Sequence, residues 1–410
     1  MKILHLMGDF RLPRDPDADG YSGIARATLE LARTQVERGH EVTVASVGPA
    51  GWQSDWRGVT LLQLKHQRWA RLPMLDLSVH LPYLLLTRRQ HFDVLHGQMY
   101  PSLRWLRGRV RVTQFHSDPV DLPAAVLARA AASSQVQIGV SDFVTAGLHR
   151  LLPGQGDMRT VPNGVQLEAF RPGRWAKERA QQRRRWGVSD DDVVFLYAGA
   201  VVPEKGLLPL AQAYTRLRIR RPGIALAVAG DSQLWDLTMS AHPSGDHDAQ
   251  VKAALHGTPG VQLLGRVAAP EMPALYAACD VLVVPSLVSE TFSLSAAEAM
   301  ASGLPVIVSR SGALPGLIGA DPDGAGLPET SPDQAPLAGL TVPPGDVSAI
   351  ETAMDRLASD APFRQAMGCA ALQRAQALSW NAAAEHFDRI YSEFASPVSL
   401  PTPSQRTPGD

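Results

Sequence analysis

The chain has 410 residues, 45% of them hydrophobic, so it is long and apolar enough to bury two separate cores. Its 39 Lys and Arg residues balance 40 Asp and Glu residues, and a formal net charge of -1 excludes the overall positive field that attracts nucleic acid or anionic lipid. The two cysteines, Cys279 and Cys369, are too few and too far apart for a disulfide framework or a metal site, which favours a reducing, cytoplasmic location.

No segment has the composition of a membrane anchor. The apolar run that begins the chain reaches Asp9 at once, without the longer apolar region and cleavage site of a signal peptide, so we expect a first core strand there. The most hydrophobic stretch, residues 72–87, is interrupted by Asp76, His80 and Pro82 and falls short of the roughly 18 to 20 uncharged residues that a bilayer requires. We therefore expect no transmembrane helix, and any contact with a membrane would be local.

In the first part of the chain, short apolar runs alternate with longer amphipathic segments, the pattern of parallel strands joined by crossover helices. Residues 22–40 place Ile24, Leu31 and Val36 at helical spacing, and Gly39 supplies a stop. We expect strands at residues 2–7, 41–47, 93–97, 111–115, 136–140 and 159–162.

The same pattern restarts near residue 193. The runs of this second set are almost continuously hydrophobic, which is typical of strands covered on both faces. They predict a second doubly wound unit, and ligands of such sheets bind at the carboxyl ends of the strands. We expect strands at residues 193–200, 224–230, 261–265, 281–286, 305–309 and 339–343.

The junction between the two units is expected at residues 163–187, which end in an arginine-rich segment. We interpret this segment as a solvated helix face, with a phosphate or lipid patch as the alternative. The Pro-, Ser- and Thr-rich tail at 397–410 is expected to be disordered.

The most informative stretch is SETFSLSAAEAMASGLPVIVS, residues 289–309. It places Glu290 at the end of a strand and loop and Glu298 about two turns into the following helix, so both carboxylates can face one cleft. The start of that helix, near Ser293, offers unpaired N–H groups and a partial positive charge, which suit hydroxyls and phosphates. The two glutamates alone would be explained as well by a helix cap and a surface residue, so the flanking sequence decides.

This stretch resembles the signature of glycosyltransferase family 4, whose members are retaining enzymes with the GT-B fold. Segments 21–44, 115–119, 140–148 and 161–165 are similar to further family blocks, as are YAGAVVPEKGLLPL, VAGDS, LLGRV and LYAACDVLVVPS in the second half. The match runs in order through about 380 of the 410 residues.

The resemblance implies two Rossmann-like doubly wound domains with a cleft between them. The acceptor-binding domain would comprise residues 1–168, and the nucleotide-sugar-binding domain residues 169–379. A C-terminal helix at about 380–396 is expected to pack back on the first domain.

The same resemblance implies roles for individual residues. Glu298 would hold the ribose of a nucleotide, Glu290 would contact the transferred sugar, and Lys205 would neutralise the diphosphate. A fixed cation beside helix N–H groups stabilises the charge that builds up as a diphosphate leaves. The other residues implied on the donor side are Gly23, Val267, Phe292, Ser293 and Leu294.

His116 ends a predicted strand, and the resemblance implies a place near the sugar and the acceptor, where it would donate to hydroxyls. We expect Gln98, Tyr100 and Asp118 on the acceptor side.

Two positions depart from the family pattern. Ala200 stands where members carry an arginine five positions before the lysine, so half of the usual diphosphate clamp is missing; Arg266 and Arg310 are the candidates to replace it. Ser293 stands where a glycine usually follows Phe292, which changes the backbone freedom beside the sugar.

No metal or other cofactor is needed, because the nucleotide sugar is itself a substrate. The Asp-Pro-Asp strings at 15–17 and 321–323 are interpreted as turns.

The resemblance thus implies transfer of a hexose or N-acetylhexosamine from a nucleoside-diphosphate sugar, UDP-GlcNAc or UDP-glucose, to a small polar acceptor. Within the family the chain is similar to transferases that glycosylate 2-deoxystreptamine in aminoglycoside antibiotic assembly. A cationic aminocyclitol would favour carboxylates on the first domain. Those available are Asp9, Asp15, Asp17, Asp19 and Asp118.

Three alternatives stay open. A lipid acceptor is suggested by the arginines and apolar residues of 103–112 and by the LPYLLL run that ends at Leu86. A non-catalytic sugar-nucleotide sensor is suggested by Ala200 alone. A dehydrogenase on the same fold is disfavoured, because no GxGxxG follows the first strand. The sequence gives no indication of the oligomeric state.

Overall fold

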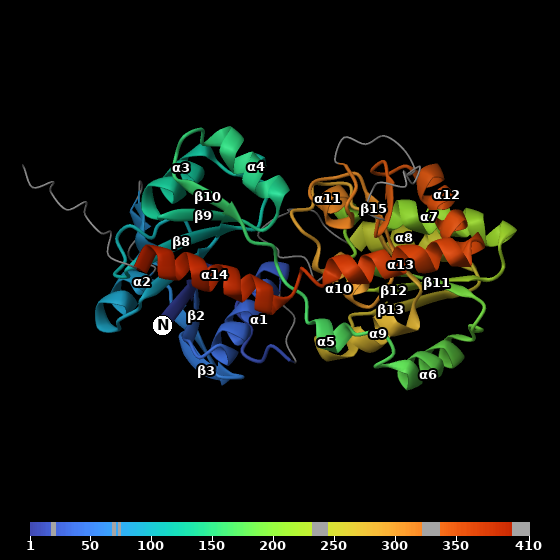
Figure 1. Cartoon of the computed structure of the whole chain (residues 1–410), viewed down its shortest axis with the longest axis horizontal. Coiled ribbons are helices and arrows are strands. Elements are labelled where there is room, and N and C mark those ends of the chain that lie inside the picture. The colour runs from blue at the N-terminus through green and yellow to red at the C-terminus, as the bar shows by residue number, and fades with distance from the viewer. Residues whose placement is uncertain (18–21, 68–70, 73–74, 232–244, 322–336, 396–410) are drawn as a thin grey trace, which may run out of the picture.

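The computed structural model describes residues 1–17, 22–67, 71–72, 75–231, 245–321 and 337–395. It contains two large sheets, each covered by helices, which lie side by side in Figure 1. The tail for which disorder was predicted lies outside the described residues.

The first sheet has eight strands in the order β10-β9-β8-β7-β1-β2-β4-β3. All neighbours are parallel except β3 and β4, which form an antiparallel hairpin at one edge. The six strands predicted for this half are confirmed, although the last begins two residues earlier; the hairpin was not predicted. The strands are β1 (Lys2–Leu6), β2 (Glu41–Gly48), β3 (Trp52–Trp56), β4 (Val59–Lys65), β7 (Val94–Gln98), β8 (Val110–Phe115), β9 (Val136–Gly139) and β10 (Asp157–Thr160), with a separate pair β5 (Arg71–Leu72) and β6 (Leu75–Asp76).

The second sheet has six parallel strands in the order β13-β12-β11-β14-β15-β16. All six predicted strands are present, and those at its centre are buried on both faces, as their continuous hydrophobicity indicated. The strands are β11 (Val193–Ala198), β12 (Ile224–Ala229), β13 (Val261–Gly265), β14 (Val281–Val284), β15 (Val306–Ser309) and β16 (Gly339–Val342).

Helices cover both faces of these sheets (Figure 1). Long helices follow most strands, and short 3-10 turns follow β8, β11 and β13. The helices are α1 (Gly23–Glu37), α2 (Leu77–Arg89), α3 (Ala124–Ser133), α4 (Asp142–Leu151), α5 (Leu167–Phe170), α6 (Ala176–Trp186), α7 (Leu207–Arg220), α8 (Gly245–Leu255), α9 (Met272–Ala278), α10 (Leu294–Ala301), α11 (Leu314–Ile318), α12 (Val347–Ser359), α13 (Ala361–Ala375) and α14 (Trp380–Ala395), with 3-10 turns η2 (Pro119–Asp121), η3 (Pro203–Lys205) and η5 (Ala269–Glu271).

The last helix, α14, returns to the first half of the chain and packs against α1 (Figure 1). Its apolar stripe, which includes Trp380, Phe387 and Tyr391, is buried in one cluster with strands of the first sheet. Where the chain crosses between the halves, Val165 and Ser379 form an isolated parallel bridge. The two crossings therefore lie side by side.

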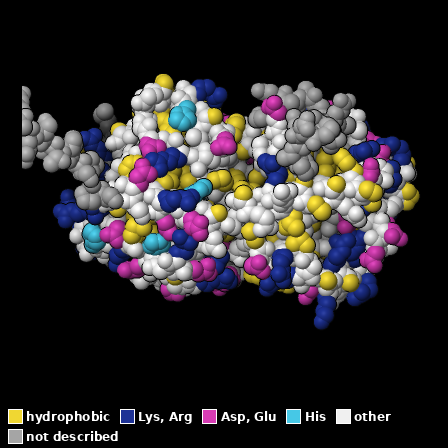
Figure 2. All heavy atoms as spheres, in the orientation of Figure 1, with side chains coloured by type: hydrophobic (Ala, Val, Ile, Leu, Met, Phe, Trp, Pro, Cys, Tyr) yellow, Lys and Arg dark blue, Asp and Glu magenta, His cyan; other side chains and the backbone are white. Residues whose placement is uncertain are grey.

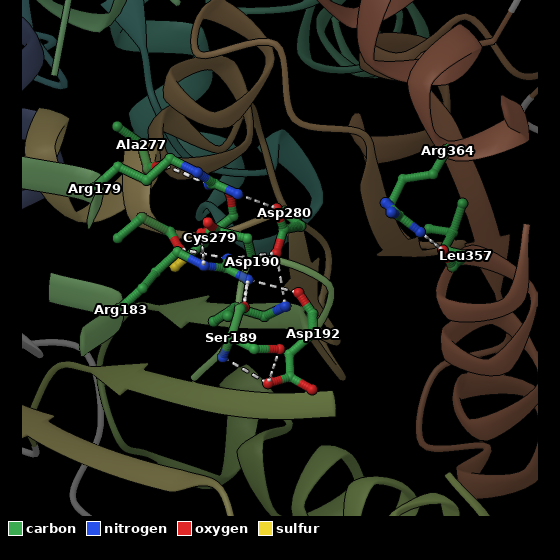
Figure 3. A network of polar contacts seen from close by, with 12 residues as sticks. Arg179, Arg183, Ser189, Asp190, Asp192, Ala277, Cys279, Asp280, Leu357 and Arg364 are labelled. Carbon is green, nitrogen blue, oxygen red and sulfur yellow. Dashed lines mark hydrogen bonds and ion pairs between the residues drawn. The ribbon is translucent and has the colours of Figure 1, made fainter. Parts of the chain in front are cut away.

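Two arginines of the arginine-rich helix α6 hold it against the rest of the domain, so the predicted solvated helix face is wrong for Arg179 and Arg183. Arg183 has a side chain that is 1% exposed and donates to Asp280 at 2.9 Å and to backbone carbonyls of the turn at 189–192 (Figure 3). Arg179 donates to the other oxygen of Asp280 at 2.8 Å and to the carbonyls of Ala277 and Cys279. The carboxylate in turn accepts from the backbone N–H of Val194, which ties α6 to the sheet.

The other basic residues of this segment are exposed, and their side chains gather over α6 at the lower right of Figure 2. Elsewhere on this face acidic and basic side chains are interspersed, in keeping with the net charge of -1. Both cysteines are unpaired, with Cys279 buried and Cys369 exposed. Within the described ranges, no helix combines the length and the apolar character needed to cross a membrane.

Candidate active site

A cleft with a volume of about 430 Å³ lies between the carboxyl ends of the two sheets. It is lined from the first half by residues that follow β1 and β8 and from the second half by residues that follow β11 and β14. Seven of the predicted site residues meet in it: Gly23, His116, Lys205, Glu290, Phe292, Ser293 and Leu294.

Lys205 and Glu290 form an ion pair in this cleft, with 2.6 Å between Nζ and Oε1. Ser286, at the end of β14, donates a second hydrogen bond to the same carboxylate oxygen. Gly206 makes the arrangement possible: its φ of +68° is left-handed, and a Cβ there would lie 1.9 Å from the carbonyl oxygen of Pro285. The turn that carries Lys205 can therefore pack directly against the loop that carries Glu290.

The start of α10 forms one wall of the cleft. Ser293 caps this helix by accepting from the backbone N–H of Ala296, and its φ of +82° lies where glycine is normally required. The chain therefore keeps the glycine-like backbone turn although serine replaces the family's usual residue. Ser293, Leu294 and Ser295 of this helix start line the cleft, and Phe292 before them is buried.

Glu298 lies deeper along α10 and is almost fully buried. It lines a second cavity of about 180 Å³, which adjoins the main cleft because Arg26 and Leu294 line both. The guanidinium of Arg26, from α1, forms an ion pair with Glu298 across the two halves. Burial raises the pKa of the Glu298 carboxyl, and Arg26 acts in the opposite direction.

Arg26 was missed by the sequence analysis. It stands one helical turn after Gly23, and a loop predicted to approach a diphosphate should have drawn attention to the next basic residue on the same face. Ala200 lines the cleft as expected, but Arg266 and Arg310 are not among its described lining residues. Within that lining, Arg26 and Lys205 are the cationic side chains.

His116 follows β8 and lines the cleft, and its carbonyl oxygen accepts from Thr291 of the second half at 2.7 Å. Its Nε2 lies 2.7 Å from Oε1 of Gln98. Because an amide oxygen only accepts, Nε2 carries the hydrogen and Nδ1 of the neutral ring is an acceptor. Burial lowers the pKa of His116 to about 3, so the ring is neutral. This arrangement leaves Nδ1 as the acceptor of the ring, whereas the sequence analysis expected His116 to donate to a ligand; the contact with a ligand stays a prediction.

The remaining predicted residues lie outside the described lining of the main cleft. Gln98 is buried behind His116, and Tyr100 is buried and bonded to His80. Asp118 caps η2 by accepting from the backbone N–H of Val120. Val267 packs against the core of the second half.

The carboxylates predicted to bind a cationic acceptor also lie outside the described lining of the main cleft. Asp17 pairs with Arg57 and lines the second cavity, while Asp9 and Asp15 are exposed outside both cavities. The Asp-Pro-Asp string at 15–17 is a turn, as predicted. Asp19 and most of the string at 321–323 lie outside the described residues. Among the side chains that are described, no group of three or more His, Cys, Asp or Glu is arranged so that it could hold a metal ion.

Two family models match the chain. The model for glycosyltransferase family 4 matches residues 21–169, and the model for group 1 glycosyl transferases matches residues 178–374. The first therefore covers the half with the eight-stranded sheet and the second the half with the six-stranded sheet.

Curated relatives are enzymes of the same kind. A D-inositol 3-phosphate glycosyltransferase of Stackebrandtia nassauensis is 29% identical over 74% of this chain and 68% of its own length. A lipopolysaccharide 1,2-N-acetylglucosaminetransferase of Salmonella typhimurium is 31% identical over 60% of this chain and 63% of its own length. For a D-inositol 3-phosphate glycosyltransferase of Kineococcus radiotolerans, 34% identical, the match spans half of the relative.

Solved structures share the whole fold. A sucrose-phosphate synthase from Thermosynechococcus elongatus superposes with a TM-score of 0.73 at 22% identity, over 96% of this chain and 98% of that one. Anabaena HepE in complex with UDP-glucose superposes with a TM-score of 0.72 at 17% identity, over 96% and 100% of the two chains. The predicted fold class is confirmed, and the chain belongs to glycosyltransferase family 4 as a glycosyltransferase with the GT-B fold.

Proposed function

We propose that the chain transfers a hexose or N-acetylhexosamine, with retention of configuration, from a nucleoside-diphosphate sugar to a hydroxyl of a small polar acceptor. The observation that carries this proposal is the charge arrangement in the cleft: Lys205 from one half, Arg26 from the other, and the start of α10 between them. Two cations and the amino end of a helix suit a diphosphate, whose negative charge grows as the glycosidic bond lengthens. These groups supply the positive charge without a metal ion.

For the donor we propose UDP-GlcNAc or UDP-glucose. The complex of Anabaena HepE with UDP-glucose supports this choice, because its fold superposes on the whole chain. The test is a thermal-shift series with UDP, GDP and ADP. A nucleotide present at a hundredfold excess over its dissociation constant stabilises the folded protein by about 2.7 kcal/mol, so the bound base gives the largest rise in melting temperature. The absence of a rise with all three would contradict a nucleotide site, and an equal rise with all three would contradict the choice of uridine.

For the reaction we propose attack from the face on which the diphosphate leaves, with the departing phosphate accepting the proton of the acceptor hydroxyl. Glu290 supports this view: one of its oxygens already accepts from both Lys205 and Ser286, which makes it a poor nucleophile. Glu290 and His116 would then position the sugar. A Glu290→Gln enzyme with full turnover would contradict this role.

For the acceptor we propose a polar cyclitol, 2-deoxystreptamine in antibiotic assembly being the specific candidate. The name of the Stackebrandtia relative supports this class, because inositol phosphate is a substituted cyclitol. Transfer assays with 2-deoxystreptamine and D-inositol 3-phosphate, using the same donor, separate a cationic from an anionic acceptor. If neither accepts sugar, the cyclitol proposal fails.

A lipid acceptor is the second candidate. Trp105 is 76% exposed, and exposed arginines at 104, 107 and 109 surround it, a combination that suits an anionic membrane interface. The LPYLLL run adds little, because Tyr83 and Leu86 are buried and only Leu85 is exposed. Sedimentation with anionic liposomes tests this candidate, and Trp105→Ala is the matching variant.

Replacing Glu298 by Gln is expected to weaken nucleotide binding. If Glu298 accepts from the ribose hydroxyls, the neutral amide loses a charge-assisted hydrogen bond, and the Kd for UDP rises by roughly one to two orders of magnitude. Isothermal titration calorimetry measures this directly. Glu178→Gln, on the exposed side of α6, is the control and should bind UDP like the parent; equal affinity of the two variants contradicts the ribose role.

A further inference from the structure

A chain of hydrogen-bonded side chains runs from His116 at the cleft through the interior of the first half. Gln98, at the end of β7, bonds His116 through Oε1 at 2.7 Å and His5, on β1, through Nε2 at 3.0 Å. His5 bonds Gln35 of α1 at 2.8 Å, and Gln35 bonds the hydroxyl of Tyr391 at 3.2 Å. Every member except His116 is 0% exposed.

This series of hydrogen bonds ends at α14. The hydroxyl of Tyr391 lies 2.7 Å from Nδ1 of His96, whose ring makes tilted contacts with His5 and Phe387, at centroid distances of 4.8 Å to each. The last helix therefore contributes both a ring and a hydroxyl to a polar network that begins at the cleft.

As its two amides are placed, the network has one direction, and the opposite direction would require both amides and every ring to change together. Amide oxygens only accept and amide nitrogens only donate. His116 therefore donates from Nε2 to Gln98, Gln98 donates to Nδ1 of His5, and His5 donates from Nε2 to Gln35. Gln35 donates to Tyr391, whose own hydrogen goes to Nδ1 of His96. In each of these hydrogen bonds, one donor atom therefore faces one acceptor atom.

The imidazoles can take part in this way only while they are neutral. Burial lowers the pKa of His5 to about 4 and that of His116 to about 3, and it holds the pKa of His96 well below the usual value. At neutral pH each ring therefore has one N–H and one bare nitrogen. Reversing any single ring or amide would place two donors or two acceptors against each other inside the protein.

We propose that Gln98, held by His5, Gln35 and Tyr391, is a positioning residue that fixes the tautomer of His116, so that Nδ1 meets the sugar or acceptor as a hydrogen-bond acceptor. Nδ1 of His116 bonds to none of the described residues, whereas Nε2 is occupied by Gln98. A substrate hydroxyl that donates to Nδ1 is held with its oxygen lone pairs free. The proposal rests on the proposed function for the identity of that substrate.

The tautomer can be measured without any substrate. Nitrogen-15 NMR of protein labelled at histidine distinguishes a ring that carries hydrogen on Nε2 from one that carries it on Nδ1, and a His116→Asn variant assigns the signal. The parent is expected to show the Nε2–H form of His116. In Gln98→Met, which keeps the volume and removes the acceptor, the signal is expected to shift toward a mixture of both forms. A retained Nε2–H form in Gln98→Met overturns the proposal.

The control is Gln137→Met, in the neighbouring strand β9. Gln137 is as buried as Gln98, but its amide bonds Ser134 and takes no part in the network. The Gln137→Met variant should therefore show the same His116 signal as the parent. If Gln98→Met does not fold, Tyr391→Phe removes only the hydroxyl at the far end and should shift the same signal; an unchanged signal there counts against the proposal.

Activity gives an independent measure. Loss of one neutral hydrogen bond to the substrate is expected to lower kcat/KM about fivefold in Gln98→Met. The Kd for UDP should not change, because UDP lacks the transferred sugar that His116 would contact. A purely structural defect would weaken both. A tautomer shift in a protein that turns over no sugar nucleotide would support the network and refute the proposed function, so the two failures are distinguishable.

Discussion

A Lys205→Met enzyme is expected to lose about 10²- to 10³-fold in kcat, the cost of removing one preorganised group that stabilises charge in a transition state. The ammonium of Lys205 is held 2.6 Å from Glu290 in the cleft, where its position is set by the turn that ends at Gly206. On the proposed mechanism it meets the diphosphate as that group departs. Methionine keeps most of the volume and removes the charge. Steady-state kinetics with the best donor measure the loss.

The matched control for this substitution is Lys252→Met. Lys252 is on α8 of the same half, 62% exposed, and pairs with Asp248 one turn away, so its loss should leave kcat unchanged. A second variant, Lys205→Arg, keeps a cation and should retain more activity than the methionine. A folded Lys205→Met protein with parental kcat would refute the assignment of the diphosphate site.

An Asp280→Ala protein is expected to be about 3–5 kcal/mol less stable than the parent, because Arg183 would then be a buried cation without a counter-charge. The guanidinium is 1% exposed and faces the Asp280 carboxylate (Figure 3). Arg179 and the N–H of Val194 lose the same acceptor. The midpoint of urea unfolding, followed by circular dichroism, measures the change.

Asp190→Ala is the control, because Asp190 is the other carboxylate near Arg183. Its side chain is 98% exposed and lies 4.0 Å from Nε, so its removal should change the stability by less than about 0.5 kcal/mol. Equal unfolding midpoints for the two variants would show that burial of the pair does not govern the stability of α6.

The sequence predicted the parallel strands well because each is a continuous apolar run between polar segments. The hairpin of β3 and β4 was not predicted because Trp52–Trp56 has three polar residues between its two tryptophans and no apolar run, as suits an edge strand with exposed side chains. The predicted position of the edge strand β10 was two residues too late for a related reason. Its residues Asp157–Thr160 are partly exposed, and the apolar residues used to predict the strand lie after them.

The candidate site was predictable where its residues are neighbours in sequence. Glu290, Phe292, Ser293 and Leu294 belong to one segment and line one cleft. Arg26 was not predictable in the same way, because it meets Glu298 across 272 positions of the chain. The hydrogen-bond partners of His116 were not predicted for a similar reason, because Gln98 and His5 come together only when their strands pair in the sheet.

The packing of α14 against α1 makes the first half of the molecule discontinuous in sequence. A fragment cut after residue 168 would leave the hydrophobic surface of α1 and its sheet open to water, since Trp380, Phe387 and Tyr391 no longer cover it. A chimaera that joins the first half of this protein to the second half of a homologue must therefore keep residues 380–395 of this protein. Such a chimaera has two splice junctions rather than one. Because both crossings lie together at Val165 and Ser379, the two junctions can be placed at a single point in space.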